Sequence, residues 1–220
     1  MKEQGVIYKP TEVETLYREI VSVYQNAFSG EPWFEVCKCE DTSEPQRCVG
    51  GFSPLPIGKV CKVCDNRLSR PAYEVNELTQ HFRQIAQAYP TAWYLEQNEN
   101  EITLAAFACK VSHKELVQEK YLDVPEMFPW TQGCLGSTEF IWLDEVFANK
   151  EKSRSGNLVN FGSMCRGFAD HLQNFTICYR TINEKMVAVA ERDFPEQSTV
   201  FKREVEIPDR RDFVVINLNQ

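Results

Sequence analysis

Residues 139–157 read EFIWLDEVFANKEKSRSGN, a mostly apolar run that gives way to a polar one. The apolar run, 139–147, is rich in aromatic and β-branched residues and predicts a buried strand. The polar run, 149–157, leads into a segment that we interpret as a helix, 158–172. A strand, a polar turn and a helix are therefore expected to follow one another here.

The turn between this strand and this helix is a generic site for a phosphate group. Unpaired backbone N–H groups and the helix dipole converge on an anion at a helix N-terminus. Lys150, Lys152 and Arg154 add positive charge to the turn, although the whole chain has a net charge of −8. The residues alone leave two interpretations open, an anion site and an ordinary solvated loop.

The remaining sequence alternates between strand-like and helix-like segments. Thr11 and Glu14 form a capping-box pattern at the start of the first helix, and residues 124–136, with two prolines and two glycines, are expected to be an irregular loop. Strands are predicted at 6–8, 92–96, 102–108, 176–181, 200–207 and 213–218, and helices at 11–27, 69–89, 113–123 and 184–192.

Composition places the chain among globular proteins with one main domain. It has 220 residues, of which 43% are hydrophobic and 25% charged, enough to bury a core. No signal or membrane-spanning run is present, so we expect a cytoplasmic protein that does not contact membranes. The acidic balance argues against a nucleic-acid partner and favours a cationic one such as an amine.

Five of the nine cysteines lie between positions 37 and 64. They fall inside a segment, 36–67, whose apolar residues follow neither the helical nor the strand periodicity. Cys61 and Cys64 form a C-x-x-C pair, and Cys48 with either Cys37 or Cys39 completes a four-thiolate set. This spacing favours one structural zinc ion, with the fifth cysteine as a bystander. Unligated thiols, a redox pair and a catalytic metal are the alternatives. The scattered cysteines are interpreted as core residues: Cys109, Cys134, Cys165 and Cys178.

The element order resembles the GNAT superfamily of acyl-CoA N-acyltransferases along the whole chain, residues 1–220. Residues 24–35 look like the aromatic-proline segment that follows the first helix of many GNAT proteins. Residues 139–156 look like the central strand and pyrophosphate loop, and 183–194 like the helix that flanks pantetheine. The resemblance implies an α/β fold with a mixed central sheet of about seven strands, flanked by helices and carrying the cysteine-rich insertion.

The resemblance also implies that acetyl-CoA is the co-substrate. By it, the backbone of Val146, Phe147 and Ala148 pairs with pantetheine. The turn that cradles the pyrophosphate comprises Lys152, Ser153, Arg154, Ser155, Gly156 and Asn157. Ser153, Gly156 and Leu158 occupy the register of the family's loop pattern, so only its first glycine is present. The Tyr that often protonates the leaving thiolate is absent near Val189 and Ala190, and Tyr179 is the candidate substitute.

An ammonium acceptor must lose a proton before it attacks a thioester, and a carboxylate can take that proton. Glu139 is the first candidate base and Glu145 the second, with solvent-facing strand residues as the alternative interpretation.

These observations predict an N-acetyltransferase for a small-molecule or peptide amine. One alternative is a catalytically inactive GNAT-like CoA-binding or regulatory protein whose zinc loop mediates interaction. Another is a zinc-dependent interaction module. The sequence does not distinguish a monomer from a homodimer.

Overall fold

The computed structural model describes residues 5–29, 71, 73–99, 101–120, 127–135, 138–149, 160–203 and 211–219. The predicted zinc insertion, 36–67, lies outside these residues, so the division of the chain into a domain and an insertion stays a prediction. None of the described helices is long and apolar enough to cross a membrane.

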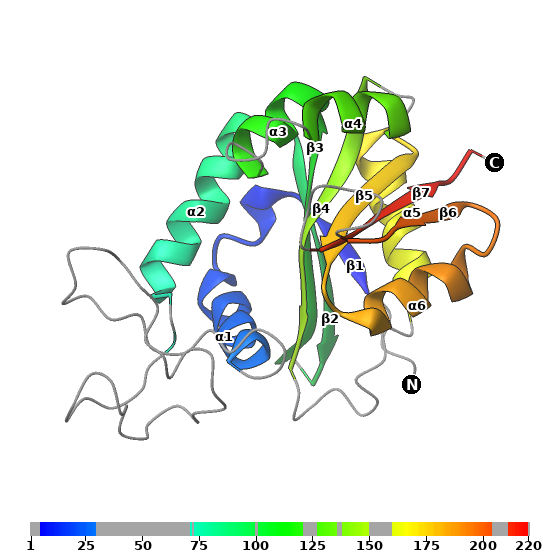
Figure 1. The fold of residues 1–220 in the computed structure, drawn as a ribbon. Helices are drawn as coiled ribbons and strands as arrows, with labels where there is room; N and C mark the ends of the chain where they lie inside the picture. The colour runs from blue at the N-terminus through cyan, green and yellow to red at the C-terminus, as the bar shows by residue number, and fades with distance from the viewer. Residues whose placement is uncertain are drawn as a thin grey trace, which may run out of the picture.

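A mixed seven-stranded sheet forms the centre of the described structure, in the order β1-β2-β3-β4-β5-β7-β6 (Figure 1). β4 and β5 are parallel, whereas the other neighbouring pairs are antiparallel. The strands are β1 (Val6–Tyr8), β2 (Thr91–Asn98), β3 (Glu101–Ser112), β4 (Glu139–Ala148), β5 (Thr176–Thr181), β6 (Ser198–Phe201) and β7 (Asp212–Asn217).

Helices cover both faces of this sheet. Figure 1 shows α1 (Tyr17–Phe28) and α2 (Val75–Ala88) on one side, and α5 (Phe161–Leu172) and α6 (Glu184–Asp193) on the other. α3 (His113–Lys120) and α4 (Met127–Leu135) pack beside Cys109 on the α1 side. Cys109 follows Phe107 by two residues, and side chains two apart share one face of a strand.

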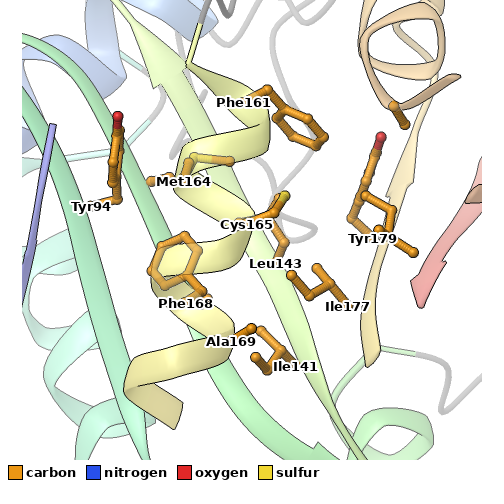
Figure 2. Packing of buried hydrophobic residues seen from close by; sticks show 14 of the residues in the cluster. Tyr94, Ile141, Leu143, Phe161, Met164, Cys165, Phe168, Ala169, Ile177 and Tyr179 are labelled. Atoms are coloured by element: carbon orange, nitrogen blue, oxygen red, sulfur yellow. The ribbon is translucent and has the colours of Figure 1, made fainter. Parts of the chain in front are cut away.

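Two large apolar clusters fill these layers. Under α1 and α2, the rings of Trp93, Phe82 and Phe107 pack with centroids 4.7 to 5.2 Å apart. Beneath α5, the buried residues belong to one cluster that also includes the inward residues of β2, β4 and β5. Figure 2 shows this cluster, including Tyr94, Ile141, Leu143, Phe161, Met164, Cys165, Phe168 and Tyr179.

The α/β class and the mixed sheet flanked by helices agree with the prediction. Three helices begin later than predicted. α1 begins at Tyr17 after a 3₁₀ turn, Pro10–Glu12, in which the Lys9 amide donates to the Glu12 side chain. α2 begins at Val75, behind a reciprocal cap between Glu74 and Glu77. α5 begins at Phe161 rather than at 158.

The expectation of an irregular loop over 124–136 is wrong for Met127–Leu135, which form α4. Pro129 is the third residue of this helix. A proline is tolerated there because the first amides of a helix have no intrahelical acceptor. At the other end of the chain, β6 spans Ser198–Phe201 and so begins two residues before the predicted strand 200–207, of which residues 204–207 lie outside the described residues.

Candidate active site

The parallel strands β4 and β5 share only a short register. Among the described residues it consists of Ile141 with Ile177 and Trp142 with Cys178. β4 nevertheless continues in register with β3 as far as Ala148. Residues 143–148 therefore have a neighbouring strand on the β3 side and no described partner in β5. We call this stretch of β4 the split.

A β-bulge lies at the start of the split. Phe107 pairs with Glu145 and Ala108 with Leu143, so Asp144 is the extra residue of β4. Bulges bend a strand and redirect its side chains, and they are frequent beside active sites. This bulge directs the Asp144 carboxylate toward α3, as its contacts with Lys120 and Trp142 indicate.

The Asp144 carboxylate is buried and only half satisfied. Its side chain is 4% exposed, and Oδ1 lies 2.5 Å from the Lys120 Nζ atom. Oδ1 also accepts a hydrogen bond of 2.9 Å from the Trp142 indole N–H. Oδ2 is buried and has no hydrogen-bond partner among the described residues. Buried carboxylate oxygens normally have donors, so this atom is a candidate for ligand binding.

Lys120 contacts both β4 and β5 at the start of the split. It is the last residue of α3, and its ammonium group pairs with Asp144 on β4. Its backbone carbonyl accepts a hydrogen bond of 3.5 Å from an Nη atom of Arg180 on β5. The end of α3 therefore contacts both strands just beyond the Trp142–Cys178 pair.

The charge of Asp144 acts on two neighbouring titratable groups. Desolvation lowers the pKa of His81 on α2, an effect that the Asp144 charge opposes. Burial is also the main reason that the pKa of the Cys109 thiol is raised well above its usual range, with the Asp144 charge contributing. Cys109 is accordingly a protonated core residue rather than a nucleophile at neutral pH.

The two carboxylates predicted as bases occupy different parts of β4. The Glu139 side chain is 58% exposed at the start of the strand, 3.6 Å from the Lys110 Nζ atom. Glu145 is partly buried and lies next to the bulge. Six residues of strand separate them by about 20 Å, at a rise of about 3.3 Å per residue. Glu145 therefore lies in the split and Glu139 is remote from it.

The three residues predicted to pair with pantetheine all lie in the split. Val146 and Ala148 pack against the cluster under α5. Phe147 faces the opposite side, with its ring centroid 5.3 Å from that of Tyr24. Both faces of the strand are thus packed, and the edge of the strand directed toward β5 is the part left for a ligand.

Tyr179 lies on β5, one residue beyond the last pair with β4. It is buried, and its hydroxyl donates a hydrogen bond of 2.9 Å to the Met186 carbonyl of α6. Burial raises the pKa of Tyr179 well above its ordinary value. The raised pKa makes Tyr179 a weaker proton donor than an ordinary tyrosine, and its proton is directed at α6.

Two carboxylates hold the N-terminus of α5. Glu96 accepts hydrogen bonds from the Asn160 side-chain amide at 2.9 Å and from the Tyr94 hydroxyl at 3.0 Å. Asp193, at the end of α6, accepts one from the Gly162 amide at 3.0 Å. The first turn of α5 is therefore fixed to β2 and to α6.

Several predicted site residues lie outside the described residues. They are the pyrophosphate-loop residues Lys152, Ser153, Arg154, Ser155, Gly156 and Asn157, and the cysteines Cys37, Cys39, Cys48, Cys61 and Cys64. Within the part of the chain that the structure describes, no cluster of three or more metal-ligating side chains occurs. Structural zinc consequently stays a prediction from spacing.

No protein-family model and no curated protein matches the sequence. Solved structures do match the fold. A mutant agmatine N-acetyltransferase in its apo form has a TM-score of 0.55 at 9% identity, covering 97% of this chain and 99% of its own. The polyamine N-acetyltransferase of Drosophila melanogaster, which forms N-acetylagmatine, has a TM-score of 0.54 at 9% identity, covering 98% and 100%.

Arylalkylamine N-acetyltransferase 2 of Aedes aegypti is similar to the same extent, with a TM-score of 0.53 at 10% identity, covering 98% of this chain and 100% of that protein. The chain therefore has the fold of GNAT N-acetyltransferases. At such low identity the likeness establishes the fold alone.

Proposed function

We propose that the chain is an acyl-CoA-dependent N-acetyltransferase that moves an acetyl group from acetyl-CoA to a small-molecule or peptide amine. The observation that carries this proposal is the split in β4. Beyond Trp142, the strand edge that faces β5 lacks a partner strand among the described residues. An amide-bearing chain such as pantetheine binds such an edge as an added strand would, through backbone hydrogen bonds.

The position of the α5 N-terminus supports the assignment of the CoA diphosphate to the segment between β4 and α5. α5 is the next described helix after β4, and helix N-termini bind phosphate through free amides and the helix dipole. Because Asp193 already accepts from the Gly162 amide, we assign the diphosphate to the residues just upstream, Lys152–Asn157. Pantetheine is assigned to Val146, Phe147 and Ala148.

The reaction requires one base and one acid. The acceptor ammonium gives up a proton, its nitrogen attacks the thioester carbonyl, the C–S bond breaks, and the thiolate takes a proton. Of the two candidate bases, Glu145 is favoured over Glu139 because it lies in the split. Tyr179 is the candidate acid in place of the tyrosine that α6 lacks, and burial, which raises the pKa of its phenol, weakens it in that role.

An inactive GNAT-like protein that binds CoA or has a regulatory role, with interactions mediated by the zinc loop, is the second candidate. One observation favours it. The Tyr179 hydroxyl donates to the Met186 carbonyl, so a transfer to a thiolate requires this hydrogen bond to break. The resemblance to GNAT proteins implies a tyrosine on α6, but Val189 and Ala190 occupy that place.

Titration calorimetry with acetyl-CoA tests the proposal first. We expect saturable binding that weakens about tenfold when Lys152 and Arg154 are both replaced by alanine, because charge-assisted hydrogen bonds to phosphate are lost. Lys202→Ala removes a cation just beyond the end of β6 and serves as the matched control, with unchanged binding. No saturable binding by the wild-type chain would reject the transferase and the CoA-binding form of the second candidate.

Thiol release then separates the two candidates. Agmatine, a linear polyamine and an arylalkylamine form the first panel, since the structurally similar enzymes are named for such amines. Turnover supports the transferase. Acetyl-CoA binding without turnover of any amine supports the inactive GNAT-like protein.

A further inference from the structure

The strongest unexplained feature of the described structure is the second oxygen of Asp144. The side chain is 4% exposed, and Oδ2 has no hydrogen-bond donor among the described residues. Proteins seldom keep a buried carboxylate oxygen without a donor, because the lost hydration is not replaced. The site therefore has an unused capacity for a group that donates N–H bonds.

Among the described residues, Lys120 supplies the only positive charge that the structure records in an ion pair with Asp144. Its ammonium group lies 2.5 Å from Oδ1, and its side chain is 22% exposed. Lys120 thus extends from the surface to a carboxylate that solvent does not reach. Removing the Lys120 side chain would leave room for an alkyl chain of similar width that ends at the Asp144 carboxylate.

The location of this pair connects it to the split. Asp144 is the bulged residue of β4, two positions beyond Trp142, and Arg180 is two positions beyond Cys178 on β5. Trp142 and Cys178 are the last described pair between these strands, so Asp144 stands where the split begins. The Val146–Ala148 edge, to which we assign pantetheine, starts two residues further along.

We propose that Asp144 binds the ammonium group of the acceptor amine, and that Lys120 occupies this position in the free protein. This proposal rests on the proposed function, for which it names the acceptor site. The acceptor's ammonium replaces that of Lys120, which moves out toward solvent. The Arg180 contact to the Lys120 carbonyl holds the end of α3 in place during this exchange.

The chemistry of the site defines the class of acceptor. A primary alkylammonium carries the three N–H donors of a lysine but is not tethered to α3, so it can lie between both oxygens of Asp144, which Lys120 does not. Trp142 adds an apolar wall and donates its indole N–H to Oδ1. A quaternary ammonium has the charge without the donors. The site therefore selects primary alkylamines over tetraalkylammonium ions.

The test uses chemical rescue of the full-length chain, read out by thermal unfolding without acetyl-CoA. Lys120→Ala leaves Asp144 without its cation and opens the space that the side chain filled. We expect propylammonium chloride to raise the Tm of this variant saturably by about 4 °C or more. Tetramethylammonium chloride at the same ionic strength should have no such effect.

Two further variants separate rescue from general salt stabilisation. In Lys120→Ala combined with Asp144→Asn, the propylammonium response should disappear. Lys202→Ala is the matched control, because Lys202 also pairs with a buried carboxylate, that of Asp212, at 3.8 Å. It should show no saturable response. A response of equal size in the double variant or in Lys202→Ala would overturn the proposal, as would no response in folded Lys120→Ala.

If Lys120→Ala does not fold, Lys120→Met keeps the bulk of the side chain without the charge, and Asp144→Asn is assayed in the otherwise wild-type chain. We expect Asp144→Asn to raise the KM for the acceptor at least tenfold with the Kd for acetyl-CoA unchanged. An unchanged acceptor KM contradicts the proposal. Amine rescue in a chain that binds no acetyl-CoA would reject the transferase and keep the amine site.

Discussion

The Asp193 carboxylate accepts a hydrogen bond of 3.0 Å from the Gly162 amide, which joins the last residue of α6 to the first turn of α5. The Asp193 side chain therefore caps the N-terminus of α5, a role usually taken by the N-cap residue of the same helix. The hydrogen bond from Arg192 is the main cause that lowers the pKa of Asp193, with the Gly162 amide adding to it against the effect of burial.

Replacing Asp193 by alanine should destabilise the protein by about 1 kcal/mol at pH 7, as loss of a helix cap does. The folded-state pKa of Asp193 is lowered, so its contribution is present above the unfolded pKa of about 3.9 and is lost as the pH falls through the folded value. Urea unfolding from pH 7 to pH 3 measures this. The difference in unfolding free energy between wild type and Asp193→Ala should narrow below about pH 4. The control variant Asp170→Ala, at an exposed position, should differ little from wild type at every pH.

Gly5 has no room for a side chain. A Cβ atom on Gly5 would lie 2.0 Å from the Cζ and hydroxyl atoms of Tyr94, a position that requires the strand or the ring to move. Gly5→Ala should cost about 1–3 kcal/mol of unfolding free energy. Gly133 in α4 has nothing within 4 Å of the same position, so Gly133→Ala should be neutral or stabilising by up to about 1 kcal/mol. Equal effects of the two changes in denaturant unfolding would contradict this reasoning.

Tyr179→Phe tests the candidate acid. The variant loses the hydrogen bond to the Met186 carbonyl and should be destabilised by about 1–3 kcal/mol. If Tyr179 protonates the leaving thiolate, kcat in a thiol-release assay falls about 10²-fold or more. Tyr89→Phe, which loses a hydroxyl contact with Glu119 outside the split, is the control for stability. A kcat unchanged in Tyr179→Phe removes this residue from the proposed chemistry.

Amide hydrogen exchange locates the co-substrate independently of turnover. Acetyl-CoA should slow exchange in a peptide that covers residues 143–148, because pantetheine would take backbone hydrogen bonds at that strand edge. Residues 212–217 of β7, paired on both sides by β5 and β6, are the internal reference and should change little. Protection confined to the reference region would contradict the assignment of pantetheine to β4.

Elemental analysis tests the cysteine spacing. We expect about one zinc per chain. Each of the single variants Cys61→Ser and Cys64→Ser should lose both the zinc and stability, because a structural zinc site contributes folding free energy. Cys165→Ala is the control: this thiol is buried under α5, so the change should lower stability without changing the zinc content. A stable, metal-free wild-type preparation would disprove the zinc site.

The order of strands and helices was predictable because it depends on local patterns. The apolar run at 139–147 predicted β4 almost to its ends, and the segment 176–181 predicted β5. α4 was missed because Pro129 and Gly133 are strong loop signals wherever the sequence is considered without its neighbours. The tolerance for Pro129 depends only on its place in the first helical turn.

The candidate site was harder to predict because it depends on strand register. Nothing local assigns Asp144 to a bulge, since the bulge exists only relative to Phe107 and Ala108 of β3. The sequence did contain one signal, an aspartate directly after four apolar residues in a strand, where aspartate is disfavoured. The approach of Lys120 to that carboxylate follows from α3 packing and could not be predicted from spacing.

The two residue pairs between β4 and β5 also have a mechanical consequence. The sheet consists of two halves, one formed by β1 to β4 and the other by β5, β7 and β6. Among the described residues, only these two pairs join the backbones of the halves. α5, which packs against β1 through β5, also connects them. Opening of the native state should therefore begin at this junction, and a ligand chain bound along β4 would make the two halves unfold as one unit.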